Sequence, residues 1–291
     1  MYVLITPAKD EAQHIRRTIE SVIRQTLPPM RWVIVDDGSN DDTWLIAKEA
    51  ADRCPWIQVL RKGGGQERGF GSKVRAFMAG YNAVGHLPYT FIGNLDADVA
   101  FEPFFYETLV REMERNPRLG VASGVVWEMT KRGARRLTIT LNHAVGATQF
   151  WRRQCFEQVG GYRPVSVGGE DALAELTARM GGWETRSFPG LKVWHLKPVD
   201  GAGGRSAVSR AYRAGLTEYH IGTWWLFACL KAVRRWRESP PIISAFVRLA
   251  AYFRCHLRRI PRDAPEDLVL YLKKEQRSRI AAVLKGKPDW K

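Results

Sequence analysis

The fold prediction starts from one stretch, Arg31-Trp32-Val33-Ile34-Val35-Asp36-Asp37-Gly38-Ser39, in which an apolar run passes directly into a polar loop. An apolar run without alternation indicates a strand that is buried on both faces of a sheet. After the loop, Asp41 or Asp42 can cap a helix that runs toward Cys54. The stretch therefore predicts a strand, a polar loop and a helix in direct succession.

The same unit recurs on both sides of this stretch. Further predicted strands are Tyr2–Thr6, which Pro7 ends, Ile57–Leu60 and Tyr89–Leu95, and further predicted helices are Asp10–Gln25 and Lys73–Val84. Strands and helices that alternate in this way predict an α/β fold, Rossmann-like, with a mostly parallel sheet flanked by helices.

Each predicted strand ends in a polar loop: 7–11, 36–39, the glycine-rich 63–71, and 96–98. Ligands of such sheets bind beyond the carboxyl ends of the strands, because loops and helix N-termini present unpaired N–H groups there. Side chains two residues apart on an extended strand point to the same side, so Asp96 and Asp98 can offer carboxylate oxygens to Mg²⁺ or Mn²⁺. The phosphate loop of ATPases and the dinucleotide fingerprint are both missing, which argues against ATPases and nicotinamide enzymes.

These loops, taken in order, resemble the signatures of family 2 glycosyltransferases with the GT-A fold. The matching segments are Pro7-Ala8-Lys9-Asp10-Glu11, Val35–Asp41, Lys73-x-x-Ala76-x-x-x-Gly80, Leu95–Asp98, Gly160-Gly161-Tyr162, Glu170-Asp171 and Val193-Trp194-His195. The resemblance covers roughly residues 1–200. It departs at Lys9-Asp10, where the family usually has an aromatic residue and Asn, and at Met78, where it often has Asn.

The resemblance implies a nucleotide-sugar donor, with a UDP-sugar favoured, and inversion at the anomeric carbon. The implied nucleotide-sugar contacts are Pro7, Ala8, Lys9, Glu11, Asp37, Lys73, Asp96, Ala97 and Asp98. The implied ligands of Mn²⁺ or Mg²⁺ are Asp98, Asp96 and His195. A structural histidine at 195 and a solvated lysine at 73 are the alternative interpretations.

Asp171 is the candidate catalytic base. A nucleoside diphosphate leaves readily once a metal offsets its charge, so no protein acid is required. One carboxylate is then enough, unlike in glycosidases, where two carboxyl groups flank the bond. Asp171 would take the proton of an acceptor hydroxyl that attacks the anomeric carbon. The alternative for Glu170-Asp171 is simple capping of the helix predicted over Ala172–Met180.

The charge of the chain is concentrated in its last third. The chain has 45 Lys and Arg against 30 Asp and Glu, a net charge of +15, and residues 205–291 hold 19 of these cations and 7 of the anions. Such an excess favours an anionic partner. We therefore predict a catalytic domain over 1–204 and a helical, basic, amphipathic region over 205–291, joined through a flexible Gly201–Gly204.

Two apolar segments of the basic region, Ile221–Val233 and Ile242–Phe253, are too short to span a bilayer. Because cations surround them, residues 221–262 are expected to meet an anionic membrane surface, where a saccharide or polyprenyl-linked saccharide would be the acceptor. Packing on the catalytic domain or on a second subunit is the alternative.

The remaining features bound the function class. The four cysteines are far apart, and no signal peptide opens the chain, so we expect a cytoplasmic protein, peripheral on the inner leaflet of the cell membrane. The enzyme would serve surface polysaccharide or glycolipid biosynthesis. The alternatives are a basic nucleic-acid-binding protein, which the charge alone allows but no recognition motif supports, and a catalytically silent glycosyltransferase-like scaffold. We expect no nucleic-acid partner.

Overall fold

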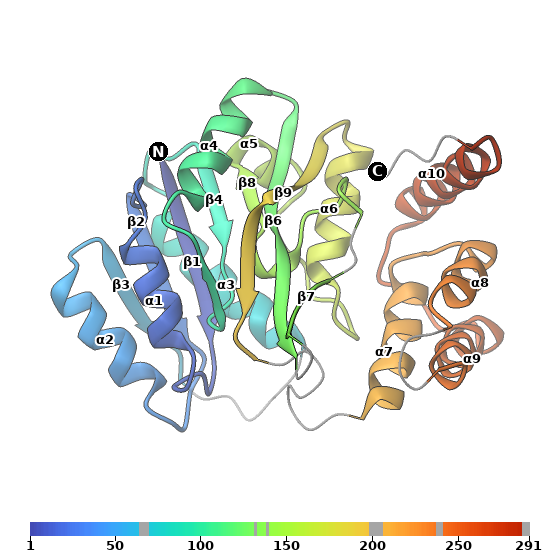
Figure 1. Ribbon diagram of the computed structural model, residues 1–291, viewed down its shortest axis with the longest axis horizontal. Coiled ribbons are helices and arrows are strands. Elements are labelled where there is room, and N and C mark those ends of the chain that lie inside the picture. Colours follow the sequence, from blue (N-terminus) through green and yellow to red (C-terminus); the bar gives the residue numbers. More distant parts are fainter. Residues whose placement is uncertain (64–69, 131–132, 138–139, 198–205, 237–240, 287–291) are drawn as a thin grey trace.

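The computed structural model describes residues 1–63, 70–130, 133–137, 140–197, 206–236 and 241–286 (Figure 1). The strands are β1 Tyr2–Ala8, β2 Arg31–Asp36, β3 Ile57–Arg61, β4 Phe91–Asn94, β5 Val99–Phe101, β6 Leu119–Thr130, β7 Gly133–Arg136, β8 Phe150–Arg152 and β9 Glu184–His195. The helices are α1 Ile15–Ile23, α2 Thr43–Arg53, α3 Phe70–Val84, α4 Phe105–Arg115, α5 Arg153–Gln158, α6 Glu170–Met180, α7 Ala207–His220, α8 Trp225–Arg234, α9 Ile243–Leu257 and α10 Glu266–Leu284, with one 3₁₀ turn, η1, at Gly146–Thr148.

The α/β fold predicted from the sequence is confirmed. The strand order is β3-β2-β1-β4-β8-β6-β9-β5, with β7 paired to β6. Strands β3, β2, β1 and β4 are mutually parallel, whereas β8 is antiparallel to both of its neighbours. The parallel half brings the carboxyl ends of β1, β2 and β4 to one edge, which is where a ligand site of this architecture is expected.

The first strand runs farther than the sequence predicted. Pro7 was expected to end it at Thr6, but β1 continues to Ala8, and Pro7 pairs in register with Val35 of β2. Strand β4 pairs with β1 only as far as Ile5. Beyond that point β1 has a neighbour on one side only, so the N–H that proline lacks costs no hydrogen bond of the sheet.

The sheet is covered on both faces, and each face has its own apolar core. Helices α1, α2 and α4 cover one face, and α3, α5 and α6 cover the other (Figure 1). On the first face, Ile15 and Ile19 of α1 pack with Leu109 of α4. On the second, Phe77 of α3 packs with Phe156 of α5. The two cores fix the strand ends that carry the polar loops.

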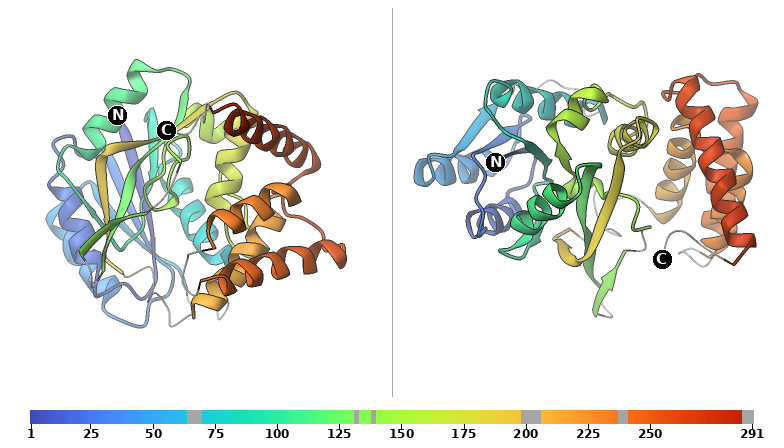
Figure 2. Two further views of the ribbon diagram at one scale, coloured as in Figure 1. Left: turned by 45° about the vertical axis from the view of Figure 1, so that its right-hand side comes forward. Right: turned by 90° about the horizontal axis from the view of Figure 1, so that it is seen from above.

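Four helices follow the last strand and form a separate layer. Helix α7 lies between the sheet and the pair α8 and α9 (Figures 1 and 2). Helix α10 returns to α6, where Leu268 and Leu272 pack on Leu173 and Leu176. The predicted boundary at 204/205 and the predicted Gly201–Gly204 connection lie outside the described residues, so the division into two domains stays a prediction.

A buried ion cluster holds the C-terminal layer together. Arg248 of α9 donates to both carboxylate oxygens of Glu218 of α7, at 2.8 and 2.7 Å, and Lys231 of α8 lies 2.5 Å from the same carboxylate. All three helices therefore meet at one anion, which needs these cations because it is buried. Among the helices that the structure describes, none has the length and apolar character needed to cross a bilayer.

Gly215 is the closest approach between α7 and α9, and it gives a test of this packing. A Cβ at residue 215 would lie 2.1 Å from the carbonyl oxygen of Arg248. Alanine normally stabilises a helix by about 1 kcal/mol relative to glycine. We expect Gly215→Ala to lower the free energy of unfolding by about 1–3 kcal/mol instead, because the helices must separate. Urea unfolding measures the sign of this change in the free energy of unfolding. Gly85→Ala, whose Cβ would meet its nearest atom at 3.6 Å, is the control, and an equally mild effect at Gly215 would contradict the packing.

Candidate functional site

The loops after β1 and β2 are tied to each other by hydrogen bonds. Asp10 N–H donates to Ser39 Oγ at 3.0 Å, and Asn40 N–H donates to Asp10 Oδ1 at 2.8 Å. Asp10 has a positive φ of 54°, a conformation that Asp tolerates better than most residues. Asp10 therefore holds the two loops together, and the half-buried Lys9 lies at this junction.

Asp36 and Asp37 have different surroundings at the end of β2. Asp36 is buried and accepts the Ser39 N–H at 3.1 Å, so it shapes the turn. Asp37 is partly exposed, accepts a hydrogen bond from Ser72 Oγ at the start of α3, and lies 3.7 Å from Lys62 Nζ. Its N–H donates to the carbonyl of the buried Ala8. Of the two carboxylates, Asp37 is therefore the one that is accessible at the loops after β1 and β2.

The segment Asp96-Ala97-Asp98 connects β4 to β5. Lys73 Nζ donates to Asp96 Oδ1 at 2.7 Å, so the lysine predicted to contact the donor is paired with a predicted metal ligand. Ala97 is buried, and its carbonyl accepts a hydrogen bond from Thr18. Burial raises the pKa of Asp98, and the neighbouring Asp96 carboxylate raises it further. Any cation between the two aspartates would therefore be favoured.

Asp98 faces His195, the last residue of β9. Their atoms Oδ2 and Nε2 are 3.8 Å apart. His195 Nδ1 lies 2.8 Å from the Lys197 carbonyl, and a proton on Nδ1 leaves the lone pair of Nε2 free. Lys197 Nζ contacts Glu11 and lies 3.9 Å from Asp98. The second oxygen of Glu11, Oε2, is buried with no hydrogen-bond partner, and burial raises the pKa of this carboxyl group.

This donor set fits a hard divalent cation. Among the described residues no three His, Cys, Asp or Glu side chains are already gathered as a metal site, because Asp96 is turned toward Lys73. Asp98 and His195 do meet the distance requirement. Two ligands at about 2.1 Å from one ion can be at most about 4.2 Å apart, and these two atoms are 3.8 Å apart.

Asp171 lies in the first turn of α6, on the same edge of the sheet. Its carboxylate rests against Gly146 of η1 so closely that a Cβ at residue 146 would lie 1.9 Å from Asp171 Oδ2. The next residue, Ala147, accepts the N–H of Asp96 at 2.9 Å. The turn η1 therefore links Asp171 to the loop that carries Asp96 and Asp98.

Electrostatics places Lys73 among the same carboxylates. Burial alone would lower the pKa of Lys73, but Asp96, Glu170 and Asp171 together raise it above its usual value. Burial raises the pKa of Glu170, and Asp171 adds to that shift. Lys73, Asp96 and Asp171, which are far apart in the sequence, thus form one charged cluster.

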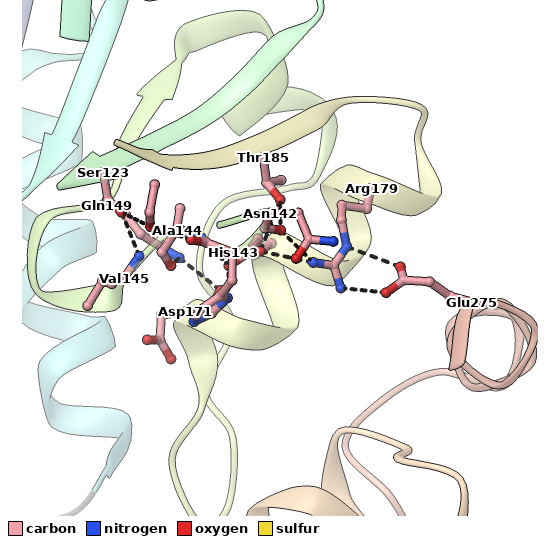
Figure 3. A network of polar contacts seen from close by, with 12 residues as sticks. Ser123, Asn142, His143, Ala144, Val145, Gln149, Asp171, Arg179, Thr185 and Glu275 are labelled. Atoms are coloured by element: carbon pink, nitrogen blue, oxygen red, sulfur yellow. Dashed lines mark hydrogen bonds and ion pairs between the residues drawn. The ribbon is translucent and has the colours of Figure 1, made fainter. Parts of the chain in front are cut away.

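A polar network beside Asp171 includes His143, Arg179 and Thr185 (Figure 3). It is centred on the buried Glu175 of α6. His143 Nδ1 lies 2.6 Å from Glu175 Oε2, and Arg179 and Thr185 each donate to Oε1 at 3.1 Å. Arg179 also pairs with Glu275 of α10, at 3.2 Å. The network fixes α6 to the loop before η1, to β9 and to the C-terminal layer.

Sequence reasoning missed several residues of this site. Lys197 follows the Val-Trp-His segment by two positions, and its pairing with Glu11 joins residues 186 positions apart. Gly146 and His143 belong to no recognised motif. Only the spatial approach of η1 to α6 reveals them.

Comparison with known proteins gives a consistent result. The family model described as Glycosyl transferase family 2 matches residues 3–169. A chondroitin synthase of Pasteurella multocida is 26% identical over 113 residues, which are 39% of this chain and only 11% of that protein. Two solved structures share the fold. The mannosyltransferase PcManGT of Pyrobaculum calidifontis, in complex with GDP-Man and Mn²⁺, has a TM-score of 0.57 at 16% identity, with 97% of this chain and 80% of that chain covered. GalNAc-T7 with UDP, GalNAc and Mn²⁺ has a TM-score of 0.61 at 14% identity, with 100% and 58% covered.

The His143–Glu175 pair predicts a pH-dependent stability. Burial alone would lower the pKa of His143, but the charge and hydrogen bond of Glu175 raise it overall. A raised pKa stabilises the folded state fully below the unfolded value of about 6.5, and this stabilisation is lost as the pH rises through the folded value. We therefore expect His143→Gln to destabilise the protein more at pH ~6 than at pH ~9 in urea unfolding.

The control is His86→Gln, which changes an exposed histidine. A destabilisation by His143→Gln that is equal at both pH values would show that the charge of His143 contributes nothing to this pair.

Proposed function

The chain belongs to glycosyl transferase family 2, and from this premise we propose that it moves a sugar from a nucleotide-sugar donor to an acceptor hydroxyl. The donor is a UDP-sugar. The acceptor is a saccharide or a lipid-linked saccharide, as polysaccharide or glycolipid assembly requires. The chain spans about a tenth of the chondroitin synthase that it matches, so its activity is argued from its own site.

One observation carries the proposal: carboxylates from two segments that are far apart in the sequence, 96–98 and 170–171, converge on one edge of the sheet. Asp96 is bonded to Lys73, Asp98 faces His195, and Asp171 rests on the turn whose Ala147 binds the Asp96 backbone. A purely structural cluster would pair each carboxylate with a cation. Among the cations of the described residues, none lies within hydrogen-bond distance of Asp98, and the Asp98 side chain is nearly buried.

The donor would lie across the ends of β1 and β2. Asp37 faces the loops and would accept a hydrogen bond from the N3–H of a uracil base, while Lys9 and Glu11 would border the nucleotide. Pro7 and Ala8 would contribute backbone surface. The related mannosyltransferase and GalNAc-T7 structures contain nucleotide donors or products together with Mn²⁺, which supports a donor and a divalent metal here.

Asp98 and His195 would hold Mn²⁺ or Mg²⁺, and Asp96 would join them once Lys73 releases it or would contact the ribose. When bound, the cation offsets the negative charge that develops on the leaving diphosphate. Lys73, the cation of the charged cluster, would face the same diphosphate; its contact with Asp96 supports this role. These residues bind and orient the donor, and no protein acid is needed.

Asp171 would act as the base. The acceptor oxygen forms a bond to the anomeric carbon as its proton passes to the Asp171 carboxylate. The bond from that carbon to the diphosphate oxygen breaks, and its electron pair leaves with the nucleoside diphosphate. Attack opposite the leaving group inverts the anomeric carbon. Gly146 allows the carboxylate to lie where the acceptor must approach.

The metal assignment predicts the behaviour of two variants. A panel of nucleotide sugars screened by thermal shift with Mn²⁺ should identify the donor, because ligand at 100 times its dissociation constant stabilises by about 2.7 kcal/mol. Asp98→Ala and His195→Ala should each weaken the Mn²⁺-dependent part of that shift. Asp52→Ala and His86→Ala, at exposed positions, are the controls. An unchanged Mn²⁺ titration in His195→Ala would remove that residue from the ligand set.

The contact of Gly146 with Asp171 predicts a separation of binding from rate. Gly146→Ala should displace the Asp171 carboxylate, and a displacement of about 1 Å costs about 100-fold in rate. We expect the release of nucleoside diphosphate to fall by about this factor, while the donor-induced thermal shift is kept. Gly190→Ala, whose Cβ meets nothing within 4 Å, is the matched control. A full rate in Gly146→Ala would show that Asp171 is not the base.

A further inference from the structure

Helices α8 and α9 expose apolar side chains to solvent. We define the outer face as Leu230 and Val233 of α8 with Ile243, Phe246 and Leu257 of α9. Phe246 is 70% exposed and Leu257 is 81% exposed. On α9, residues 243, 246, 250 and 257 follow helical spacing, so they share one side of the helix. A patch of this kind is unusual on a monomeric soluble protein and marks an interaction site.

The buried side of helix α9 is mixed in character. It carries the polar Ser244 and Arg248 together with Ala251, Tyr252 and Cys255, and Arg248 forms the two hydrogen bonds to Glu218 of α7. The inward contacts of α9 are therefore made by these side chains, so its exposed apolar residues lie outside the face that packs on the rest of the chain.

Exposed cations lie at the C-terminal ends of the two helices that carry the outer face. Arg234 at the end of α8 and Arg258 and Arg259 after α9 are exposed, and residues 205–291 carry 19 Lys and Arg against 7 Asp and Glu. A second copy of the chain would bring the same positive charge against this face, which is unfavourable. Anionic headgroups above an apolar layer complement both properties.

We propose that the outer face docks the protein on an anionic phospholipid surface. Helix α9 has 15 residues and extends about 22 Å, shorter than the roughly 30 Å hydrocarbon core, so it would lie in the interface instead of spanning it. Helices α8 and α9 lie beyond α7 at the end of the molecule away from the sheet, where a flat surface reaches them (Figures 1 and 2). The inference extends the proposed function, on which it rests for the lipid-linked acceptor.

Co-sedimentation of the full chain with vesicles tests the proposal. We expect binding to vesicles of phosphatidylcholine and phosphatidylglycerol, weaker binding at high salt, and little binding to phosphatidylcholine alone. The double variant Phe246→Ser with Leu257→Ser should weaken binding by about tenfold or more, because two apolar side chains no longer enter the lipid. The matched control changes Phe104 and Leu45, two exposed apolar residues of the sheet region, to Ser and should bind as the wild type does.

Two results would overturn the proposal. Equal recovery with neutral and anionic vesicles would contradict the role of anionic lipids. Unchanged binding of the Phe246→Ser, Leu257→Ser variant would contradict the role of the outer face. Sedimentation velocity adds a third: a wild-type dimer that the double variant converts to monomer would identify the outer face as a subunit interface. The Mn²⁺-dependent donor shift should be the same in this variant. If the wild-type protein binds vesicles but shows no Mn²⁺-dependent donor shift, the proposed function is contradicted and the docking proposal is not.

Discussion

The ion pair between Lys73 and Asp96 is the interaction on which the arrangement of the site depends. Two acidic segments, 96–98 and 170–171, meet at one edge of the sheet, and without a cation among them their like charges would force the loops apart. Lys73 lies 2.7 Å from Asp96 and close enough to Glu170 and Asp171 to interact with their charges, so one residue at the start of α3 offsets all of them. If the proposed function is correct, this lysine holds the arrangement of the carboxylates before the donor binds.

The second half of the molecule is held by buried charges as well. Glu175 collects His143, Arg179 and Thr185 below the site, and Glu218 collects Arg248 and Lys231 in the C-terminal layer. Arg179 joins the two parts through Glu275 of α10. Glu175 and Glu218 are each paired more than once, which stabilises a carboxylate in a low-dielectric interior. Helix α6, which carries Asp171, therefore contacts both the sheet region and the C-terminal layer.

Much of the fold could be predicted from the sequence, because apolar runs followed by polar loops are local patterns. The strands around 31–36 and 57–61 and the polar loop 36–39 were found in this way, whereas most of the predicted loop 63–71 lies outside the described residues. Contacts that join segments far apart in the sequence could not be predicted. Nothing near Lys197 signals Glu11, and a lone glycine at 146 gives no hint of Asp171. The apolar stripe of α9 was visible in the sequence, but the pattern does not say which of its residues are covered. Only the packing around the Arg248–Glu218 pair shows that Ile243, Phe246 and Leu257 stay exposed.

The contact between Gly146 and Asp171 also limits which relatives can work in the same way. Volume occupied by any larger residue at that position is volume taken from the carboxylate. A related protein could keep every aspartate of the motifs and still lack space for the carboxylate that we propose as the base. This would happen if a larger residue replaced its counterpart of Gly146. Whether a related chain can transfer a sugar would then depend on a residue without a reactive side chain. A search restricted to reactive groups would overlook this residue.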